Sequence, residues 1–404
     1  MAAPHNMATA LRSYNVSGTI RDVSDLITNL DPDKTKLTQM FGKTTVKSTK
    51  HEWLSDSLRP AMTNKHPEVI NFDTTETVPR RWLYNYVQQF MHGYNISDIT
   101  QAVEKYGVRD EIAYQFVKAG KEIAADLEYA IIKNDKATPM AENVAGTFGG
   151  VPYFLDKDFD VTVASNLVTL ASHGFVNGDA LLVRGNASAA ENTPFYVAVK
   201  DANSFYLYDT PEKAMSSIID IHTGAQKSSG EGAHALADGK CKMSFQNCID
   251  ATKDVAKGAL TFDILNDAME LTWKRGGNPT VAIMSAHNKR GAAGFTQGAL
   301  PIRQQSDGTI KTSLEVIETD FGSLRLEAHR MYSDDVVDLL DTQYWKLGYL
   351  IPFHTEQPPR VGTYTEKVIT GVVGLECTAP NANARIKGLN GTVTPKPVIV
   401  ETIS

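Results

Sequence analysis

The feature that most constrains the fold is a long amphipathic stretch between residues 97 and 135. Apolar side chains recur on it at spacings of three and four, as on one face of a helix. The members of this stripe are Ile112, Phe116, Ala119, Ile123, Leu127, Ala130 and Asn134. Ser97 is placed to cap the helix, and Gly107 marks a weak point. Unbroken, about 38 residues would span about 57 Å, which predicts a rod that organises an elongated subunit.

The two faces of this predicted helix have different roles. Ile112, Phe116, Ile123 and Leu127 are the expected core contacts. The charged residues lie mostly on the other face, where we expect solvent; they are Lys118, Lys121, Glu122, Asp126 and Glu128.

Residues 41–95 hold two strand-like runs, TTVKSTKHEWL and RRWLYNYVQQFMHGYNI, separated by a polar stretch that contains Pro60 and Pro67. This order predicts a projecting hairpin, and an isolated hairpin is only marginally stable in water. We therefore expect it to contact another chain. Aromatic side chains dominate the centres of such contacts, so the expected anchors are Trp53, Trp82, Tyr84 and Phe90. The alternative is that they pack within one subunit.

The remaining segments predict a mixed α+β protein and not a regular β-α-β alternation. Residues 1–40 have little core-forming density and indicate either an extended arm or a disordered terminus. Residues 150–240 carry short β-rich runs (FDVTVAS, ALLVRG, PFYVAV, SFYLYD) and indicate a small inserted β domain. A helix follows, with Thr261 as its expected N-cap and Gly276-Gly277 as its stop.

Composition and motifs argue against several classes of function. The formal charge of −7 argues against a dedicated nucleic-acid binder. The three cysteines are too few for a disulfide framework, and their spacing predicts reduced thiols and no zinc site. The sequence has no apolar run of about 18 residues, so we expect no membrane helix. No P-loop, GxGxxG or GxSxG element is present. We therefore predict no catalytic residue, cofactor or metal.

Three clusters of polar residues are candidate chemical sites. His51 and Glu52 are adjacent and would point to opposite faces of a strand. His354 and Glu356 can share a strand face, where a plain surface pair is favoured over a pH-sensitive contact. The four aspartates of an acidic cluster are expected at turns and solvated edges rather than around a cation. They are Asp334, Asp335, Asp338 and Asp341.

Four sequence blocks occur in a fixed order and together carry a resemblance. They are HEWLSDSL from His51, RDEIAYQFVKAGKEIAADLEYAIIKN from Arg109, TDFGSLRLEAHRM from Thr319 and VVDLLDTQYWKLGYLIPF from Val336. They closely resemble a family of phage major head proteins with the Hong Kong 97-type capsid fold. The resemblance covers most of residues 10–390 outside the β-rich insertion. One departure is Ile351, which stands where relatives commonly have arginine.

The resemblance implies an architecture. Its parts are an N-arm (1–40), an E-loop (41–95), a P-domain with the long spine helix (96–149), the inserted β-rich domain (150–240), an A-domain (241–349), P-domain strands (350–378) and a C-terminal A-domain segment with a tail (379–404). The insertion is similar to accessory β domains of other phage virion proteins, and we expect it on the outer face of a shell.

The function that this resemblance implies is structural. Copies would self-assemble into hexamers and pentamers of an icosahedral or prolate head, made in the host cytoplasm, which encloses double-stranded DNA without binding it specifically. The implied partners are a portal protein, a scaffolding protein and decoration proteins, with no membrane. The alternatives are a nanocompartment shell protein of the same fold, or a ligand-binding module centred on the insertion.

Overall fold

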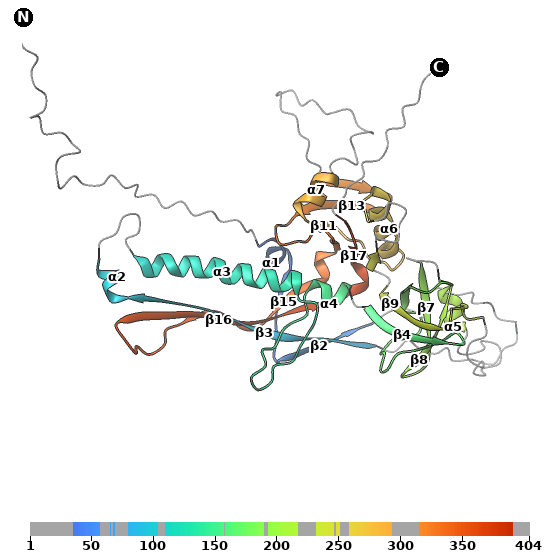
Figure 1. The fold of residues 1–404 in the computed structure, drawn as a ribbon, viewed down its shortest axis with the longest axis horizontal. Coiled ribbons are helices and arrows are strands. Elements are labelled where there is room, and N and C mark those ends of the chain that lie inside the picture. The colour runs from blue at the N-terminus through green and yellow to red at the C-terminus, as the bar shows by residue number, and fades with distance from the viewer. Residues whose placement is uncertain are drawn as a thin grey trace, which may run out of the picture.

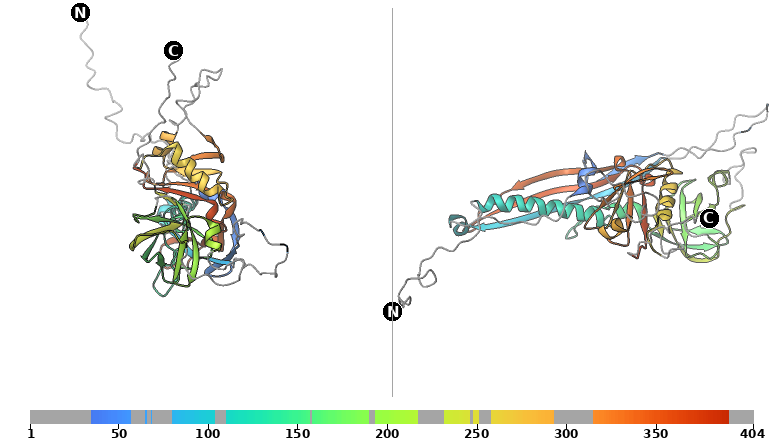
Figure 2. Two further views of the ribbon diagram at one scale, coloured as in Figure 1. Left: turned by 90° about the vertical axis from the view of Figure 1, so that its right-hand side faces the viewer. Right: turned by 90° about the horizontal axis from the view of Figure 1, so that it is seen from above.

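The computed structural model describes residues 35–56, 65, 68, 80–103, 110–156, 158–189, 193–216, 232–245, 248–250, 258–292 and 315–390. Three bodies lie along an elongated molecule: a long sheet with a helix on it, a compact sheet, and a barrel at the opposite end (Figures 1 and 2). Most of the predicted arm, the tip of the predicted hairpin and Gly107 lie outside the described residues.

The long sheet has five strands in the order β1-β15-β16-β3-β2. They are β1 (Gly42–Thr45), β15 (Trp345–Glu356), β16 (Tyr364–Cys377), β3 (Arg81–Ser97) and β2 (Lys50–Ser55). β1 runs parallel to β15, and the other pairs are antiparallel. β3 pairs with β2 up to Tyr86 and with β16 from Val87 onward. The β2–β3 hairpin is therefore a direct extension of the sheet.

The predicted long helix is two helices, α2 (Asp98–Ala102) and α3 (Glu111–Lys133). Ser97 caps α2 as predicted, because its side chain accepts a hydrogen bond from the Thr100 amide at 3.2 Å. The helix is not continuous, because Val103 is extended, and Gly107, the predicted weak point, lies between the two helices but outside the described residues. Asp110 starts a new helix by accepting hydrogen bonds from two amides of the next turn. α3 alone spans about 34 Å at about 1.5 Å per residue.

α3 lies along the long sheet, and its buried contacts are concentrated in its C-terminal half (Figure 1). Ile123 and Leu127 are buried in the core that α3 shares with the sheet. Ile112 is half-buried, and Phe116 is 43% exposed, so its predicted core role fails within one chain. The reason is that β15 ends opposite Val368. Only two strands, β3 and β16, continue under the first turns of α3, and they cover less of the helix than three strands would.

The compact sheet has six strands in the order β10-β17-β14-β11-β13-β12. They are β10 (Cys248–Asp250), β17 (Ala384–Lys387), β14 (Val337–Leu340), β11 (Val281–Met284), β13 (Gly322–Ala328) and β12 (Val316–Thr319). α6 (Phe262–Trp273) packs on it with an apolar face. Thr261 caps this helix and Gly276, at φ +79°, follows its end, which confirms both predicted signals. α7 (Ala286–Ala292) follows β11.

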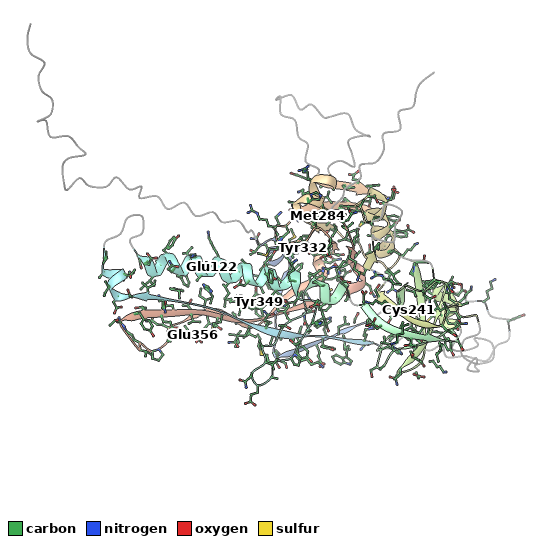
Figure 3. All side chains as sticks on the ribbon, viewed as in Figure 1. Glu122, Cys241, Met284, Tyr332, Tyr349 and Glu356 are labelled. Atoms are coloured by element: carbon green, nitrogen blue, oxygen red, sulfur yellow. The ribbon has the colours of Figure 1, made fainter. Side chains whose placement is uncertain are left out.

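The barrel closes in the order β4-β5-β8-β7-β6-β9. Its strands are β4 (Asp158–Ala164), β5 (Leu167–Thr169), β8 (Ser204–Tyr208), β7 (Pro194–Asp201), β6 (Ala180–Arg184) and β9 (Gly239–Phe245), with α5 (Pro211–Ser216) outside them. It has its own apolar core, and Cys241 lies in it, well apart from Met284 and Tyr332 of the compact sheet and its connections (Figure 3).

The barrel does not coincide with the predicted segment 150–240. α4 (Val151–Leu155) packs in the core under α3, because its apolar side chains face that core. β9 extends the barrel to Phe245, because it pairs with both β4 and β6 and so closes the ring.

Candidate functional site

One face of the β2–β3 hairpin exposes apolar side chains next to one another. Leu54 lies directly opposite Trp82 in the strand register, and their side chains are 48% and 63% exposed. Tyr84, two residues further along the strand, is 41% exposed, with Lys50 Nζ 4.6 Å from the centre of its ring. We call Leu54, Trp82 and Tyr84 the hairpin strip. Such a row of exposed apolar side chains marks an interaction surface.

The other two predicted anchors are core residues of their own chain. Trp53 is buried, donates from Nε1 to the Cys377 carbonyl oxygen at 3.0 Å and lies 6.1 Å from the Phe154 ring. Phe90 is buried beside Phe148, with ring centres 6.2 Å apart. Both residues follow the alternative stated for the anchors, which is packing within one subunit. Neighbouring residues on a strand face opposite sides, which separates Trp53 from Leu54.

The hairpin is held at both ends while the strip stays exposed. Arg81 forms an ion pair with Asp179 of the barrel, and Asp179 also accepts a hydrogen bond from the Val176 amide at 3.0 Å. At the other end, His51 Nε2 lies 3.1 Å from Glu376 Oε2 on β16. The hairpin therefore has a defined orientation relative to both the barrel and the long sheet.

A group of charged side chains at the root of the barrel joins it to the compact sheet. Lys387 on β17 contacts both Asp156 and Asp158, the latter at 3.0 Å. Arg184 Nη1 lies 3.2 Å from Asp158 Oδ1, and its Nη2 donates to the Cys248 carbonyl oxygen at 2.7 Å. Burial raises the pKa of Asp156, but the hydrogen bond and charge of Lys387 outweigh this and hold that pKa below its usual range.

The acidic cluster does not converge on one point. Asp334 and Asp335 are exposed, and Asp341 caps a short turn. Asp338 is fully buried, which corrects its predicted place at a solvated edge. It accepts two hydrogen bonds from Arg385, both at 2.7 Å, and one from the Tyr332 hydroxyl at 2.8 Å. Sequence reasoning missed this pair, because Arg385 is distant in sequence and only strand pairing brings it to Asp338.

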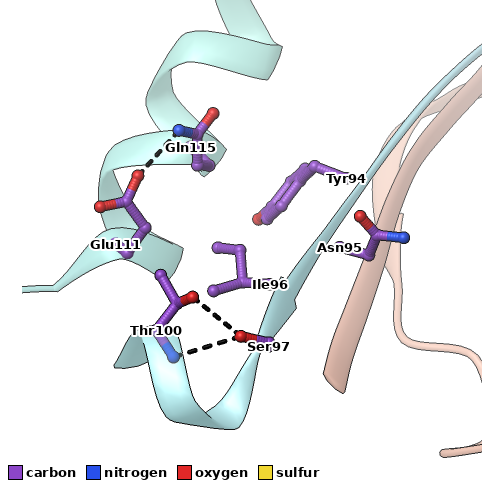
Figure 4. A pocket seen from close by; sticks show the side chains of 7 residues that line it. All are labelled: Tyr94, Asn95, Ile96, Ser97, Thr100, Glu111 and Gln115. Atoms are coloured by element: carbon purple, nitrogen blue, oxygen red, sulfur yellow. Dashed lines mark hydrogen bonds between the residues drawn. The ribbon is translucent and has the colours of Figure 1, made fainter. Parts of the chain in front are cut away.

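The far end of the long sheet holds a pocket of about 370 Å³ between β3, α2 and α3 (Figure 4). The Tyr94 hydroxyl is buried and has no hydrogen-bond partner among the described residues. Burial, and then the charge of Asp110, raise the pKa of Tyr94. Gln115 donates to Glu111 at 2.9 Å on the opposite wall. The lining does not pair a nucleophile with a base, so it gives no catalytic arrangement.

In the described part of the chain, no helix is long and apolar enough to cross a membrane.

Two solved capsid structures have a similar fold. A chain from the capsid structure of the cyanophage P-SCSP1u aligns over 93% of each chain, with a TM-score of 0.50 and 9% identity. A chain from the capsid of an empty GTA particle aligns over 95% of this chain and 100% of its own, with a TM-score of 0.50 and 11% identity. The fold is therefore the α+β fold of Hong Kong 97-type capsids.

Sequence comparison identifies the family. The major capsid protein of Escherichia phage Phieco32 is 29% identical over 133 residues, which are 33% of this chain. The match spans 38% of that relative's length. The family model for the SU10 major capsid protein matches residues 4–390, and the chain belongs to this family.

Proposed function

We propose that this chain is the shell-forming subunit of a tailed-phage head. Copies join head to tail into hexamers and pentamers, because a heterologous contact closes into rings when its rotation fits. These close into an icosahedral or prolate head around double-stranded DNA. The family consists of structural capsid proteins, so the activity we propose is assembly and not catalysis. A portal protein, a scaffolding protein and decoration proteins are the proposed partners.

In this proposal each body of the subunit has a role. The β2–β3 hairpin is the E-loop, the long sheet with α3 is the P-domain, and the compact sheet is the A-domain. The barrel is an inserted domain on the outer face of the shell. The net charge of −7 suits a wall that encloses DNA without gripping it, since phosphate binding depends on clustered Lys and Arg.

The observation that carries the proposal is the hairpin strip. A large apolar side chain stabilises a contact by about 1.5–3 kcal/mol when it becomes fully buried. Leu54 and Trp82 lie side by side on the paired strands β2 and β3, and their own chain buries little of their surface. A neighbouring copy that covers them would supply that burial at every contact of the shell.

The test is assembly of Trp82→Ala and Leu54→Ala chains, followed by electron microscopy and sedimentation. Removing a central aromatic anchor costs about 2–4 kcal/mol per contact, so we expect few closed shells and a large population of free subunits. Lys200→Ala, an exposed change on β7 of the barrel, is the matched control and should assemble normally. Normal shells from the Trp82→Ala, Leu54→Ala double variant would contradict the proposed contact.

A further inference from the structure

Glu128 of α3 is buried although it belongs to the predicted solvent face of the helix. Its carboxylate faces α1 (Lys36–Met40), the first described helix of the chain. It accepts hydrogen bonds from the Leu37 amide at 2.7 Å, the Thr38 amide at 2.9 Å and the Thr38 hydroxyl at 2.5 Å. A side chain some 90 residues away thus satisfies the free amides at the start of α1.

A fourth hydrogen bond comes from His329, just after β13. His329 Nε2 lies 3.1 Å from Glu128 Oε1, and its Nδ1 accepts from the Met331 amide at 3.2 Å. A ring nitrogen that accepts carries no proton, so this arrangement corresponds to a neutral imidazole that donates from Nε2. Glu128 is then a single buried negative charge held by four donors.

The surrounding charged groups are engaged elsewhere. Lys36 pairs with Glu327 at 2.6 Å and also donates to a carbonyl oxygen of the same strand. Tyr332, whose ring centre is 5.9 Å from that of His329, donates to Asp338, and Asp338 is paired with Arg385. The carboxylate of Glu128 therefore acts mainly on α1 and His329.

The electrostatics favour the ionised carboxylate. Burial raises the pKa of Glu128, but the hydrogen bonds from His329, Thr38 and Leu37 outweigh burial and hold that pKa below its usual range. A carboxylate with a lowered pKa stabilises the folded contact above its unfolded pKa, and this contribution is lost as pH falls through the folded pKa.

α1 depends on this contact more than a longer helix would. It has five residues, and its own N-cap, Thr35, makes no side-chain capping bond. A helix this short is not stable alone. Apolar packing holds it as well, since Leu37 is buried and Phe41 stacks on Trp345 with ring centres 5.4 Å apart. Packing holds α1 down, while the directional bonds to Glu128 set its orientation.

We propose that Glu128 is the positioning residue for the N-terminal segment. Its carboxylate, oriented by His329, fixes the position and direction of α1 between α3 and β13. In the assembled shell this fixes the point from which the chain before Thr35 starts, a consequence that rests on the proposed function.

The direct test is amide hydrogen exchange of the full-length, unassembled Glu128→Gln chain. Glutamine keeps the volume, but its NH₂ group opposes a donor, so protection of the Leu37 and Thr38 amides should fall by at least about tenfold. In the wild type the same protection should fall on acidification below the usual carboxylate range, and in Glu128→Gln it should not. Unchanged protection at both amides would overturn the assignment.

Glu122→Gln is the matched control, because Glu122 lies on the same helix and pairs at the surface with His92 at 2.9 Å. It should leave Leu37 and Thr38 protected. His329→Gln retains a donor and should show an intermediate loss. A thermal unfolding scan of each variant shows that exchange is measured on folded chains.

Assembly of the same variants separates this inference from the proposed function. Irregular or open shells from Glu128→Gln, with normal shells from Glu122→Gln, would support the role in assembly. Normal shells from Glu128→Gln would overturn that role, and the proposed function would stand. Chains that form no shell even as wild type, with scaffolding protein present, would instead contradict the proposed function.

Discussion

The barrel and the long sheet are both built of β-strands, but only one of them is closed. Every barrel strand pairs on both sides, and the barrel surrounds its own core. The long sheet ends at β1 and β2 and leaves Met91 70% exposed, with Ile351 also exposed. Open edges and exposed apolar residues promote association. The barrel is therefore complete within one chain, and the sheet with its hairpin is suited to completion by neighbours.

The largest expected effect tests the independence of the barrel. Phe205→Ala removes a fully buried ring from the barrel core and should destabilise the barrel by about 3–5 kcal/mol. Segment-resolved hydrogen exchange should show the loss in the barrel strands and leave α3 protected. Phe148→Ala, an equally buried ring under α3, should give the reverse pattern. Equal loss in both bodies from either variant would refute separate cores.

A smaller effect is expected at the root of the barrel. Lys387→Met leaves Asp156 and Asp158 without their shared cation and should cost about 1.5–3 kcal/mol. The pKa of Asp156 is lowered in the folded chain, so the ion pair stabilises the fold above the unfolded pKa. This stabilisation is lost as pH falls through the folded pKa. Urea unfolding of wild type and Lys387→Met should therefore converge in acid. A constant difference at every pH would argue against the ion pair.

The hairpin strip should behave in the opposite way to the barrel core. Trp82→Ala removes an exposed ring, so the unfolding free energy of the free subunit should change by no more than about 0.5 kcal/mol. Chemical unfolding of the unassembled chain measures this directly. A large destabilisation would show that Trp82 packs within the subunit, as Trp53 does, and would remove the strip as a free surface.

Local signals were the ones that the sequence could predict. Ser97 and Thr261 cap helices through atoms within a few residues, so their role needs no knowledge of the fold. The hairpin strands and the β-rich runs follow from residue type and alternation in the same way. The blocks from His51 to Phe353 predicted the capsid fold, which the solved shells bear out.

Features that depend on distant pairing could not be predicted. The spacing of three and four residues puts Phe116 on the same helix face as Ile123 and Leu127. The exposure of Phe116, however, depends on how many strands lie beneath that part of the helix. Glu128 follows the charged face of α3, and only the docking of α1 and His329 buries it. Trp53 and Trp82 have similar local patterns, and the sequence does not show which face of the hairpin meets the core.

The smallest effect is expected at His354. It lies near the end of β15, where it pairs with Thr370 of β16. The Pro352 carbonyl, and then Glu356 at 3.0 Å from Nε2, raise the pKa of His354. Because the pKa is raised, the His354–Glu356 pair stabilises the folded chain below the unfolded pKa of His354. This stabilisation is lost as pH rises through the folded pKa. Because the imidazole is exposed, solvent screens the pair and Glu356→Gln should leave subunit stability unchanged. It should lower the pKa of His354 only in part, since the Pro352 contact remains, and NMR titration of the imidazole measures that shift. An unchanged titration would mean that the Pro352 carbonyl alone raises the pKa of His354. A large loss of stability would mean that other parts of the same chain cover this end of the sheet, which would contradict an open sheet.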